Sequence, residues 1–152
     1  MFKIDSNQVI KMSRGDNIKF PLFLNKGSKK CPIRYEFEPG DGCEIYFYIF
    51  NYNSSIDCPL LEKVFTAEND LWYNNDGTTN NDIKIELSPD DPLINDKYSL
   101  KDLCEGEYLY QLKAKLLDRE ESLQKGENVY VINTITNRHP LYIIDDDYNR
   151  TW

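Results

Sequence analysis

The sequence predicts an all-β fold, an antiparallel β-sandwich of about seven to nine strands. The first observation behind this prediction is composition: the 152 residues include 11 tyrosines and 7 phenylalanines but only two alanines, Ala67 and Ala114. Alanine is the best helix former, whereas aromatic and β-branched residues suit the half-buried surface of a sheet. The second observation is a set of short segments in which apolar and polar residues alternate, with turn residues between them and no helical pattern. A chain of this length is expected to form one domain.

Eight segments carry the pattern expected of strands. In chain order they are residues 9–12, 18–24, 43–50, 61–66, 83–87, 108–116, 129–135 and 141–144. Pro21 cannot donate a backbone hydrogen bond, so the second segment is expected at a sheet edge or at a bulge. The third segment differs from the others, because Tyr46, Tyr48 and Phe50 make its second face apolar as well. That pattern predicts a central strand covered on both sides, and these three side chains are candidates for an interface.

The connections between these segments are polar. Residues 67–82 form a long predicted loop rich in Asn, Asp and Gly, and residues 117–128 form a charged hairpin loop with room for one helical turn. Residues 1–145 are interpreted as a single β-sandwich domain, followed by an acidic, aromatic tail over residues 146–152.

Aromatic side chains outside the predicted strands are further candidates for contact surfaces. They are Trp72 and Tyr73 in the long loop, and Tyr148 and Trp152 in the tail, with Arg150 between the last two. Exposed Trp and Tyr are favoured at protein interfaces and as platforms for sugar rings. The alternative is that each folds back to cap an end of the sandwich, and the sequence leaves both interpretations open.

A glycine two residues before a tyrosine opens the segment 108–116, in the order Gly106, Tyr108, Tyr110. This spacing resembles the tyrosine corner of immunoglobulin-like sandwiches, in which the tyrosine hydroxyl bonds to backbone a few residues upstream. Tyr110 then takes the inward position that a disulfide cysteine holds in antibody domains. The alternative is an ordinary loop followed by a strand with a buried tyrosine, and a β-sandwich follows from either interpretation.

The charge balance excludes several partners. Lys and Arg number 18 against 26 Asp and Glu, which gives a net charge of -8 and an isoelectric point near 4.7. Nucleic acids and anionic membranes are bound through excess positive charge, so neither is an expected partner.

No secretory signal pattern is visible, and no apolar run approaches the ~18 residues that span a bilayer. The four cysteines lack a Cys-x-x-Cys pair and are expected to be reduced thiols, with two disulfides as the weaker alternative: Cys31, Cys43, Cys58 and Cys104.

Neither catalysis nor a metal or cofactor is expected. His139 is the only histidine, and the pattern places it in a turn before Pro140, so no histidine pair is available for zinc. The aspartates at 145–147 lack the spacing of a calcium loop, and no glycine-rich phosphate loop occurs.

Arg14, Gly15 and Asp16 form the tripeptide that adhesion receptors bind. A tight turn explains these residues better, because glycine tolerates positive φ and the aspartate side chain can bond to nearby backbone amides. The sequence therefore predicts a turn before segment 18–24.

Four motifs follow one another in a recognisable order. An Arg-Gly-Asp-Asn turn occupies 14–17, a Gly-Asp pair at 40–41 precedes an apolar strand, an acidic Ser-Pro-Asp-Asp segment ends a strand at 88–91, and Gly-x-Tyr-x-Tyr occupies 106–110. This succession resembles the N-terminal domain of the baseplate upper proteins of tailed phages that infect Gram-positive bacteria, over residues 2–145. The resemblance implies an immunoglobulin-like β-sandwich that docks into a symmetric baseplate or related virion assembly, without enzymatic activity.

The function expected from this resemblance is that of a phage structural protein in the virion, made in the cytoplasm of the bacterial host. Its expected partners are other virion proteins and copies of itself. Members of the family usually continue into linkers and further domains, whereas this chain ends at Trp152, so a free-standing tail, baseplate or capsid-surface protein is expected. Two alternatives stay open: a carbohydrate-binding module in which Trp72 and Tyr73 stack on host-surface glycans, and a capsid-surface decoration protein.

Overall fold

The chain is all-β, as its composition predicts, and of the residues that the structure describes 47% are in strands and 8% in helices. The structure is a computed structural model and describes residues 2–4, 9–27, 32–53, 58–95, 97–135 and 138–144. Its strands are β1 (Phe2–Ile4), β2 (Ile10–Ser13), β3 (Ile18–Leu22), β4 (Asn25–Gly27), β5 (Pro32–Arg34), β6 (Glu44–Asn51), β7 (Leu61–Thr66), β8 (Ile83–Leu87), β9 (Gly106–Leu117), β10 (Tyr130–Thr134) and β11 (His139–Ile144). Its helical elements are the 3₁₀ turn η1 (Leu100–Asp102) and the helix α1 (Arg119–Lys125). Neither described helix is long and apolar enough to cross a lipid bilayer.

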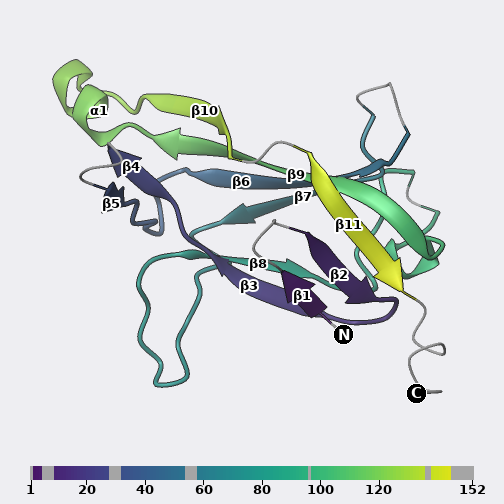
Figure 1. Cartoon of the computed structure of the whole chain (residues 1–152). Coiled ribbons are helices and arrows are strands. Elements are labelled where there is room, and N and C mark those ends of the chain that lie inside the picture. Colours follow the sequence, from purple (N-terminus) through teal and green to yellow (C-terminus); the bar gives the residue numbers. More distant parts are fainter. Residues whose placement is uncertain are drawn as a thin grey trace.

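Seven strands form one curled sheet in the order β1-β2-β11-β9-β6-β7, with β10 also paired to β9 (Figure 1). The pairs are antiparallel except for β2 and β11, which run parallel. β6 is a central strand, as predicted, because it pairs with β7 through Tyr46 opposite Val64 and with β9 through Tyr46 opposite Lys113.

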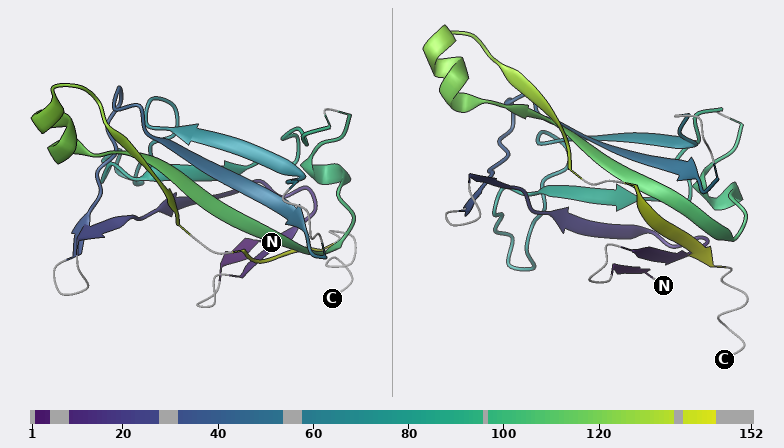
Figure 2. Two further views of the ribbon diagram at one scale, coloured as in Figure 1. Left: turned by 90° about the horizontal axis from the view of Figure 1, so that it is seen from above. Right: turned by 45° about the horizontal axis from the view of Figure 1, so that its top comes forward.

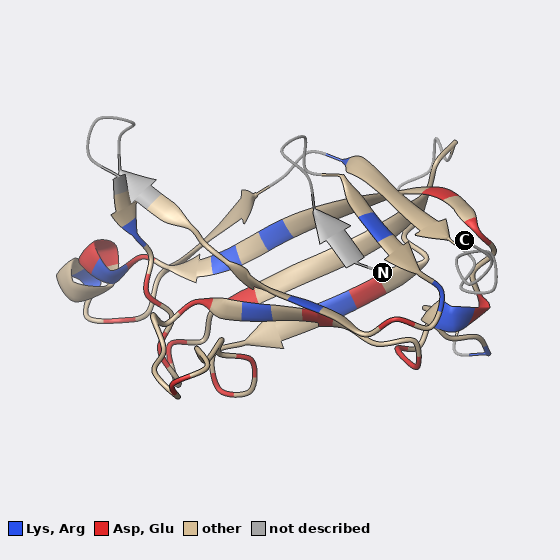
Figure 3. Ribbon diagram, turned by 60° about the horizontal axis from the view of Figure 1, so that its bottom comes forward, with Lys and Arg blue, Asp and Glu red and all other residues tan. Residues whose placement is uncertain are grey.

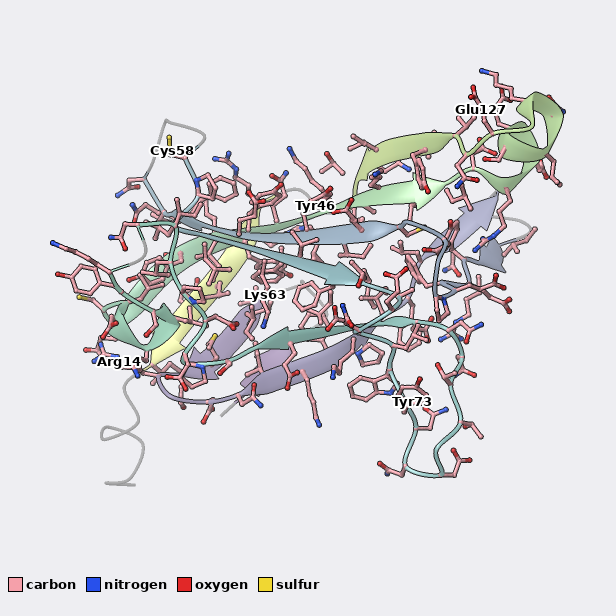
Figure 4. All side chains as sticks on the ribbon, turned by 180° about the vertical axis from the view of Figure 1, so that it is seen from behind. Arg14, Tyr46, Cys58, Lys63, Tyr73 and Glu127 are labelled. Atoms are coloured by element: carbon pink, nitrogen blue, oxygen red, sulfur yellow. The ribbon has the colours of Figure 1, made fainter. Side chains whose placement is uncertain are left out.

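A two-stranded sheet of β3 and β8 faces the large sheet across a shared core (Figure 2). Ile18 of β3 and Ile85 of β8 belong to the same buried cluster as Phe47 of β6. No described strand pairs with the other side of β3, which confirms the edge position predicted from Pro21. Lys63 of β7 ties the two sheets together, because its Nζ donates to the carbonyl oxygen of Glu86 at 2.7 Å and to the carboxylate of Asp91 at 2.9 Å (Figure 4).

The alternation of apolar and polar residues predicted several strands closely. β7 and β8 have the predicted bounds of 61–66 and 83–87. The predicted strand number was too low, because the described residues form eleven strands and β1, β4 and β5 have only three residues each, too few to show an alternation. The expectation of a wholly antiparallel sheet was also wrong, since β2 joins β11 in parallel.

The loop 117–128 holds more helix than the single turn predicted. α1 has seven residues, about two turns. The side chain of Asp118 accepts a hydrogen bond from the N–H of Glu121 as the N-cap, and Gly126 ends the helix with a φ of 71°. Both are standard helix-terminating signals.

The end of β9, α1 and β10 form a hairpin arm (residues 113–134) that projects beyond the two sheets (Figures 1 and 2). Hydrogen bonds attach the part of the arm next to α1 to the segment before β6. The Tyr130 hydroxyl donates to the carbonyl oxygen of Asp41 at 2.8 Å, and the Tyr35 hydroxyl donates to the carbonyl oxygen of Leu117 at 2.8 Å. The N–H of Leu117 donates to Cys43 Sγ at 3.3 Å.

Tyr108 makes the hydrogen bond that the tyrosine-corner interpretation expects. Its hydroxyl donates to the carbonyl oxygen of Cys104 at 2.7 Å, which fastens the loop after η1 to the start of β9, where Gly106 has a φ of 146°. Tyr110 lies inward and buried, and its ring stacks on that of Phe47 with centroids 5.6 Å apart. The immunoglobulin-like character of the two facing sheets stays a prediction.

Candidate functional site

The side of the large sheet that faces away from the core carries a row of aromatic rings. Tyr46, Tyr48 and Phe50 alternate along β6 with core residues, so the period-two geometry of a strand puts them on one face. The ring centroids of Tyr46 and Tyr48 are 6.3 Å apart, and those of Tyr48 and Phe50 are 6.1 Å apart. We call these three residues the aromatic ladder.

The prediction that β6 is covered on both sides is wrong for the ladder face. Seen from above in Figure 2, no described helix or strand lies over it. Phe50 is 4% exposed, but Tyr46 and Tyr48 are only half-buried. The alternation of residues along a strand indicates that a face is apolar. It does not indicate whether another part of the same chain covers that face.

Long cationic side chains give the ladder a partial cover. The guanidinium carbon of Arg138 lies 3.8 Å from the centre of the Phe50 ring, and Lys113 Nζ lies 5.9 Å from the centre of the Tyr48 ring. A cation over a ring contributes about 0.5–1 kcal/mol at an exposed site. Under these contacts Phe50 is almost fully buried, whereas Tyr48 stays only half-buried.

A depression of about 480 Å³ opens on the ladder. It is lined by Tyr48, Phe50, Pro59, Glu62, Gln111, Lys113, Thr134 and Arg138. Pockets of this size hold small ligands, and a few polar groups among apolar walls orient them. The combination of rings with a carboxylate, an amide and two cations suits a polar chain, such as a peptide or an oligosaccharide.

The two ladder tyrosines stay neutral at physiological pH. Burial raises the pKa of Tyr46 and of Tyr48, and the nearby carboxylates of Glu44 and Glu62, respectively, raise it further. A neutral phenol both donates and accepts hydrogen bonds, so each ring offers an apolar face and a polar tip to a partner.

Trp72 and Tyr73 do not join the ladder. Tyr73 lies on the loop below the two-stranded sheet, on the opposite side of the molecule from Tyr46 (Figure 4), and Trp72 directly precedes it in the chain. Tyr73 is 60% exposed, whereas Trp72 is half-buried and its backbone N–H donates to the carbonyl oxygen of Asp82 at 2.9 Å. The remaining predicted interface residues, Tyr148, Arg150 and Trp152, lie with the whole predicted tail outside the described residues.

The Arg14-Gly15-Asp16 tripeptide forms the predicted turn, between β2 and β3. The N–H of Asp16 donates to the carbonyl oxygen of Ser13 at 3.0 Å, and Gly15 has a φ of 94°. The N–H of Arg14 donates to the carbonyl oxygen of Ile144 at 2.7 Å, so the turn also fastens the end of β11.

His139 lies in a strand, and its predicted position in a turn was wrong. It is paired with Tyr110 across β11 and β9, with ring centroids 6.1 Å apart. Pro140 is tolerated there because its nitrogen points to the β2 side, and β2 pairs with β11 only from Leu141 onward.

Two buried carboxylates, those of Asp41 and Asp82, hold the fold together through hydrogen bonds and an ion pair. Asp41 accepts hydrogen bonds from the N–H groups of Glu38 and Cys43 at 2.9 and 2.8 Å, and buried Asp82 pairs with Arg34. Within the described ranges, no three His, Cys, Asp or Glu side chains are grouped to hold a metal. Cys43 is a buried free thiol, whereas the free thiols of Cys58 and Cys104 are exposed; Cys31 lies outside the described residues.

The sequence interpretation missed the polar side chains around the ladder. Gln111 stands opposite Tyr48 on β9, and Glu62 stands opposite it on β7. The alternation of each segment was visible, but the register that brings these side chains to one depression was not.

No protein-family model matches this chain, and no curated protein or solved structure matches it significantly.

Proposed function

We propose that this protein is a non-enzymatic structural component of a phage virion, in the tail or baseplate, which acts through protein–protein contacts in a symmetric assembly. The observation that carries the proposal is the aromatic ladder, in which the rings of Tyr46 and Tyr48 stay only half-buried. Tyr, Phe and Arg are enriched at interfaces, and the ladder combines Tyr46, Tyr48 and Phe50 with Arg138, which lies over the Phe50 ring. Such a face is typical of a surface that meets a partner.

The motifs that resemble baseplate upper proteins support the proposal through their places in the fold. Residues 14–17 form the turn before β3, and residues 40–42 form the turn before β6. Asp91, in the segment after β8, binds Lys63 of the large sheet, and Tyr108 fastens the start of β9. The likeness therefore lies at residues that shape the turns and connections of this fold.

The distribution of charge also favours assembly. Many acidic residues lie in connecting loops, whereas several Lys and Arg residues lie within strands (Figure 3). Copies with a net charge of -8 repel one another at long range, so stable contacts form where negative charge is low. The ladder face, with Lys113 and Arg138 over its rings, is such a place.

The composition of purified particles tests this proposal. Particles released from a host that carries the gene are purified by density gradient, washed in high salt, and analysed by quantitative mass spectrometry. We expect this chain in a fixed ratio to the tail proteins, lost on Tyr48→Ala and retained on Tyr73→Ala, an exposed tyrosine outside the ladder. Particles that lack the unmodified chain would refute the proposal.

The depression favours a second candidate, a carbohydrate-binding module. Its wall combines the Tyr48 ring with the amide of Gln111 and the carboxylate of Glu62, which are side chains that bind sugar rings and hydroxyls. Calorimetric titration with host cell-wall glycans is expected to give heat that Tyr48→Ala abolishes and Trp72→Ala leaves intact. No heat with any of these glycans removes this candidate.

A further inference from the structure

One side of β10 is open. The strand pairs with β9, and no described strand lies on its other side. At the two ends of this pairing, the N–H of Asp118 donates to the carbonyl oxygen of Val129 at 2.8 Å, and the N–H of Ile135 donates to that of Leu112 at 2.9 Å. Alternate residues of an antiparallel strand bond to the same neighbour, so Val131 and Asn133 also bond toward β9. Tyr130, Ile132 and Thr134 therefore turn their N–H and C=O groups to the open side.

The sequence of β10 lacks the devices that protect edge strands from pairing. Natural edges carry charged residues, prolines or bulges that discourage another strand. Every other described edge strand has a charged residue or a proline: β1, β3, β4, β5, β7 and β8. β10 reads Tyr-Val-Ile-Asn-Thr, and no charged residue occurs between Glu127 and Arg138. Ile132 is nevertheless 73% exposed, and Val131 is 41% exposed.

We propose that β10 pairs in antiparallel fashion with β10 of a second copy, about a twofold axis at Ile132. In this register Ile132 faces its own counterpart, and Tyr130 faces Thr134 of the second copy. These three residues are the ones whose N–H and C=O groups point to the open side, so all of them find partners. The two seven-stranded sheets then become one continuous sheet.

A second copy fits this edge better than an unrelated strand does. A twofold contact is self-complementary, and the register about Ile132 uses the full length of the strand on both copies. Each copy carries a net charge of -8, and β10 offers a contact at which no two like charges face each other. The exposed Ile132 side chain then lies beside its own counterpart, and the exposed Val131 side chain lies opposite Asn133 of the other copy.

The pairing specifies the self-contact that the proposed virion function expects, and it rests on that function only for its biological setting. The two fail separately. A chain that is present in particles but never pairs through β10 refutes the pairing alone, and a chain that pairs in solution but is absent from particles refutes the virion function alone.

Cysteine cross-linking tests the pairing and its register. The full chain with Cys31, Cys58 and Cys104 replaced by Ser receives either Ile132→Cys or Thr134→Cys and is oxidised mildly. Cα atoms of a hydrogen-bonded antiparallel pair lie about 5.5 Å apart, within the range of a disulfide. Thr134 of one copy lies roughly 13 Å from Thr134 of the other, because four residues of strand separate them. We expect a covalent dimer for Ile132→Cys and none for Thr134→Cys; no dimer, or equal dimers for both variants, overturns the proposal.

Loss of the dimer on charge insertion gives the second readout. Ile132→Lys places two ammonium groups opposite each other at the axis, and sedimentation equilibrium is expected to show a dissociation constant of the dimer raised about tenfold or more. Folding is monitored by circular dichroism and is expected to be unchanged, because Ile132 is exposed. Leu123→Lys, at an exposed position of α1, is the matched control and keeps the dimer. An Ile132→Lys chain that dimerises like the unmodified protein, or an unmodified chain that is monomeric at every concentration, overturns the pairing.

Discussion

Gly42 combines two constraints at one residue. Its φ is 78°, and a Cβ atom there would lie 2.2 Å from the hydroxyl oxygen of Tyr130, the group that donates to the carbonyl oxygen of Asp41. We expect Gly42→Ala to lower the free energy of unfolding by about 2–3 kcal/mol, from the left-handed backbone and from the loss of the Tyr130 hydrogen bond. Urea denaturation measures the change.

Gly40→Ala is the matched control for this prediction. Its φ is 87°, but a Cβ atom would meet nothing within 4 Å, so only the backbone cost of about 1–2 kcal/mol is expected. In a Tyr130→Phe background the cost of Gly42→Ala is expected to fall toward that of Gly40→Ala. Equal costs at the two glycines in the unmodified chain would contradict the predicted clash.

Because of Cys43 and Tyr35, we expect the free energy of unfolding to fall at alkaline pH. The Tyr35 hydroxyl and Cys43 Sγ lie 3.3 Å apart, and burial raises the pKa of both groups. Above the pKa of the unfolded chain, the unfolded state loses these protons while the folded state keeps them. The stabilisation is therefore complete below about pH 9 and is lost as the pH rises, by at most about 1.4 kcal/mol per pH unit for each proton.

Denaturation midpoints between pH 8 and pH 11 check this pH dependence. Cys43→Ala removes one of the two protons and is expected to flatten the decline, whereas Cys104→Ala, at an exposed thiol, leaves it unchanged. A decline that is the same in all three proteins would assign it to other groups.

At the scale of elements, the loop after η1 depends on the Tyr108 hydroxyl. This hydroxyl donates to the carbonyl oxygen of Cys104 at 2.7 Å, and Tyr108 is half-buried. Tyr108→Phe keeps the ring and removes the bond, so we expect a loss of about 1 kcal/mol in the free energy of unfolding. Tyr98→Phe, at an exposed tyrosine, serves as the control and is expected to be neutral. Equal stability of the two variants would show that the corner contributes nothing.

The elements that the sequence predicted well are those with one buried and one solvated face. β8 shows this alternation over its full length, and Leu61 and Phe65 bury one face of β7. β4 and β5 show no such alternation, and distant partners hold them: Arg34 of β5 pairs with Asp82, and the N–H of Tyr35 bonds to the carbonyl oxygen of Leu24. Such contacts between residues far apart in sequence leave no periodic signal.

The candidate site was predictable only in part for the same reason. The second apolar face of segment 43–50 marked the ladder residues, because aromatic side chains at every second position lie on one side of any strand. The pairing of β6 with β7 brings Glu62 to the ladder, and its pairing with β9 brings Gln111 there. Arg138, directly before β11, lines the same depression. The open edge of β10 likewise depends on which strand β9 takes as its neighbour.

At the scale of the whole molecule, the two sheets form one core, and hydrogen bonds from Leu117, Arg119 and Tyr130 fasten the far half of the arm to the segment before β6. Lys63 links the sheets through Glu86 and Asp91, whereas Tyr130 is the residue of β10 that bonds to the segment before β6. Native-state hydrogen exchange, followed by NMR, is expected to show this division. Amides of β6 exchange most slowly, because β6 lies between two paired strands over the core, and those of the arm exchange faster through local opening.

Within β10, exchange is expected to alternate. At low protein concentration the N–H groups of Val131 and Asn133, directed at β9, are protected, whereas those of Tyr130, Ile132 and Thr134 exchange at nearly the rate of unfolded chain. Raising the concentration until copies pair protects the second set and leaves the first set almost unchanged, since only the open side gains partners. Uniform protection along β10 at low concentration would contradict an open edge. Alternation that persists at every concentration would show an edge that stays open, so that the copies of this protein meet through another surface, with the aromatic ladder the next to test by Tyr48→Ala.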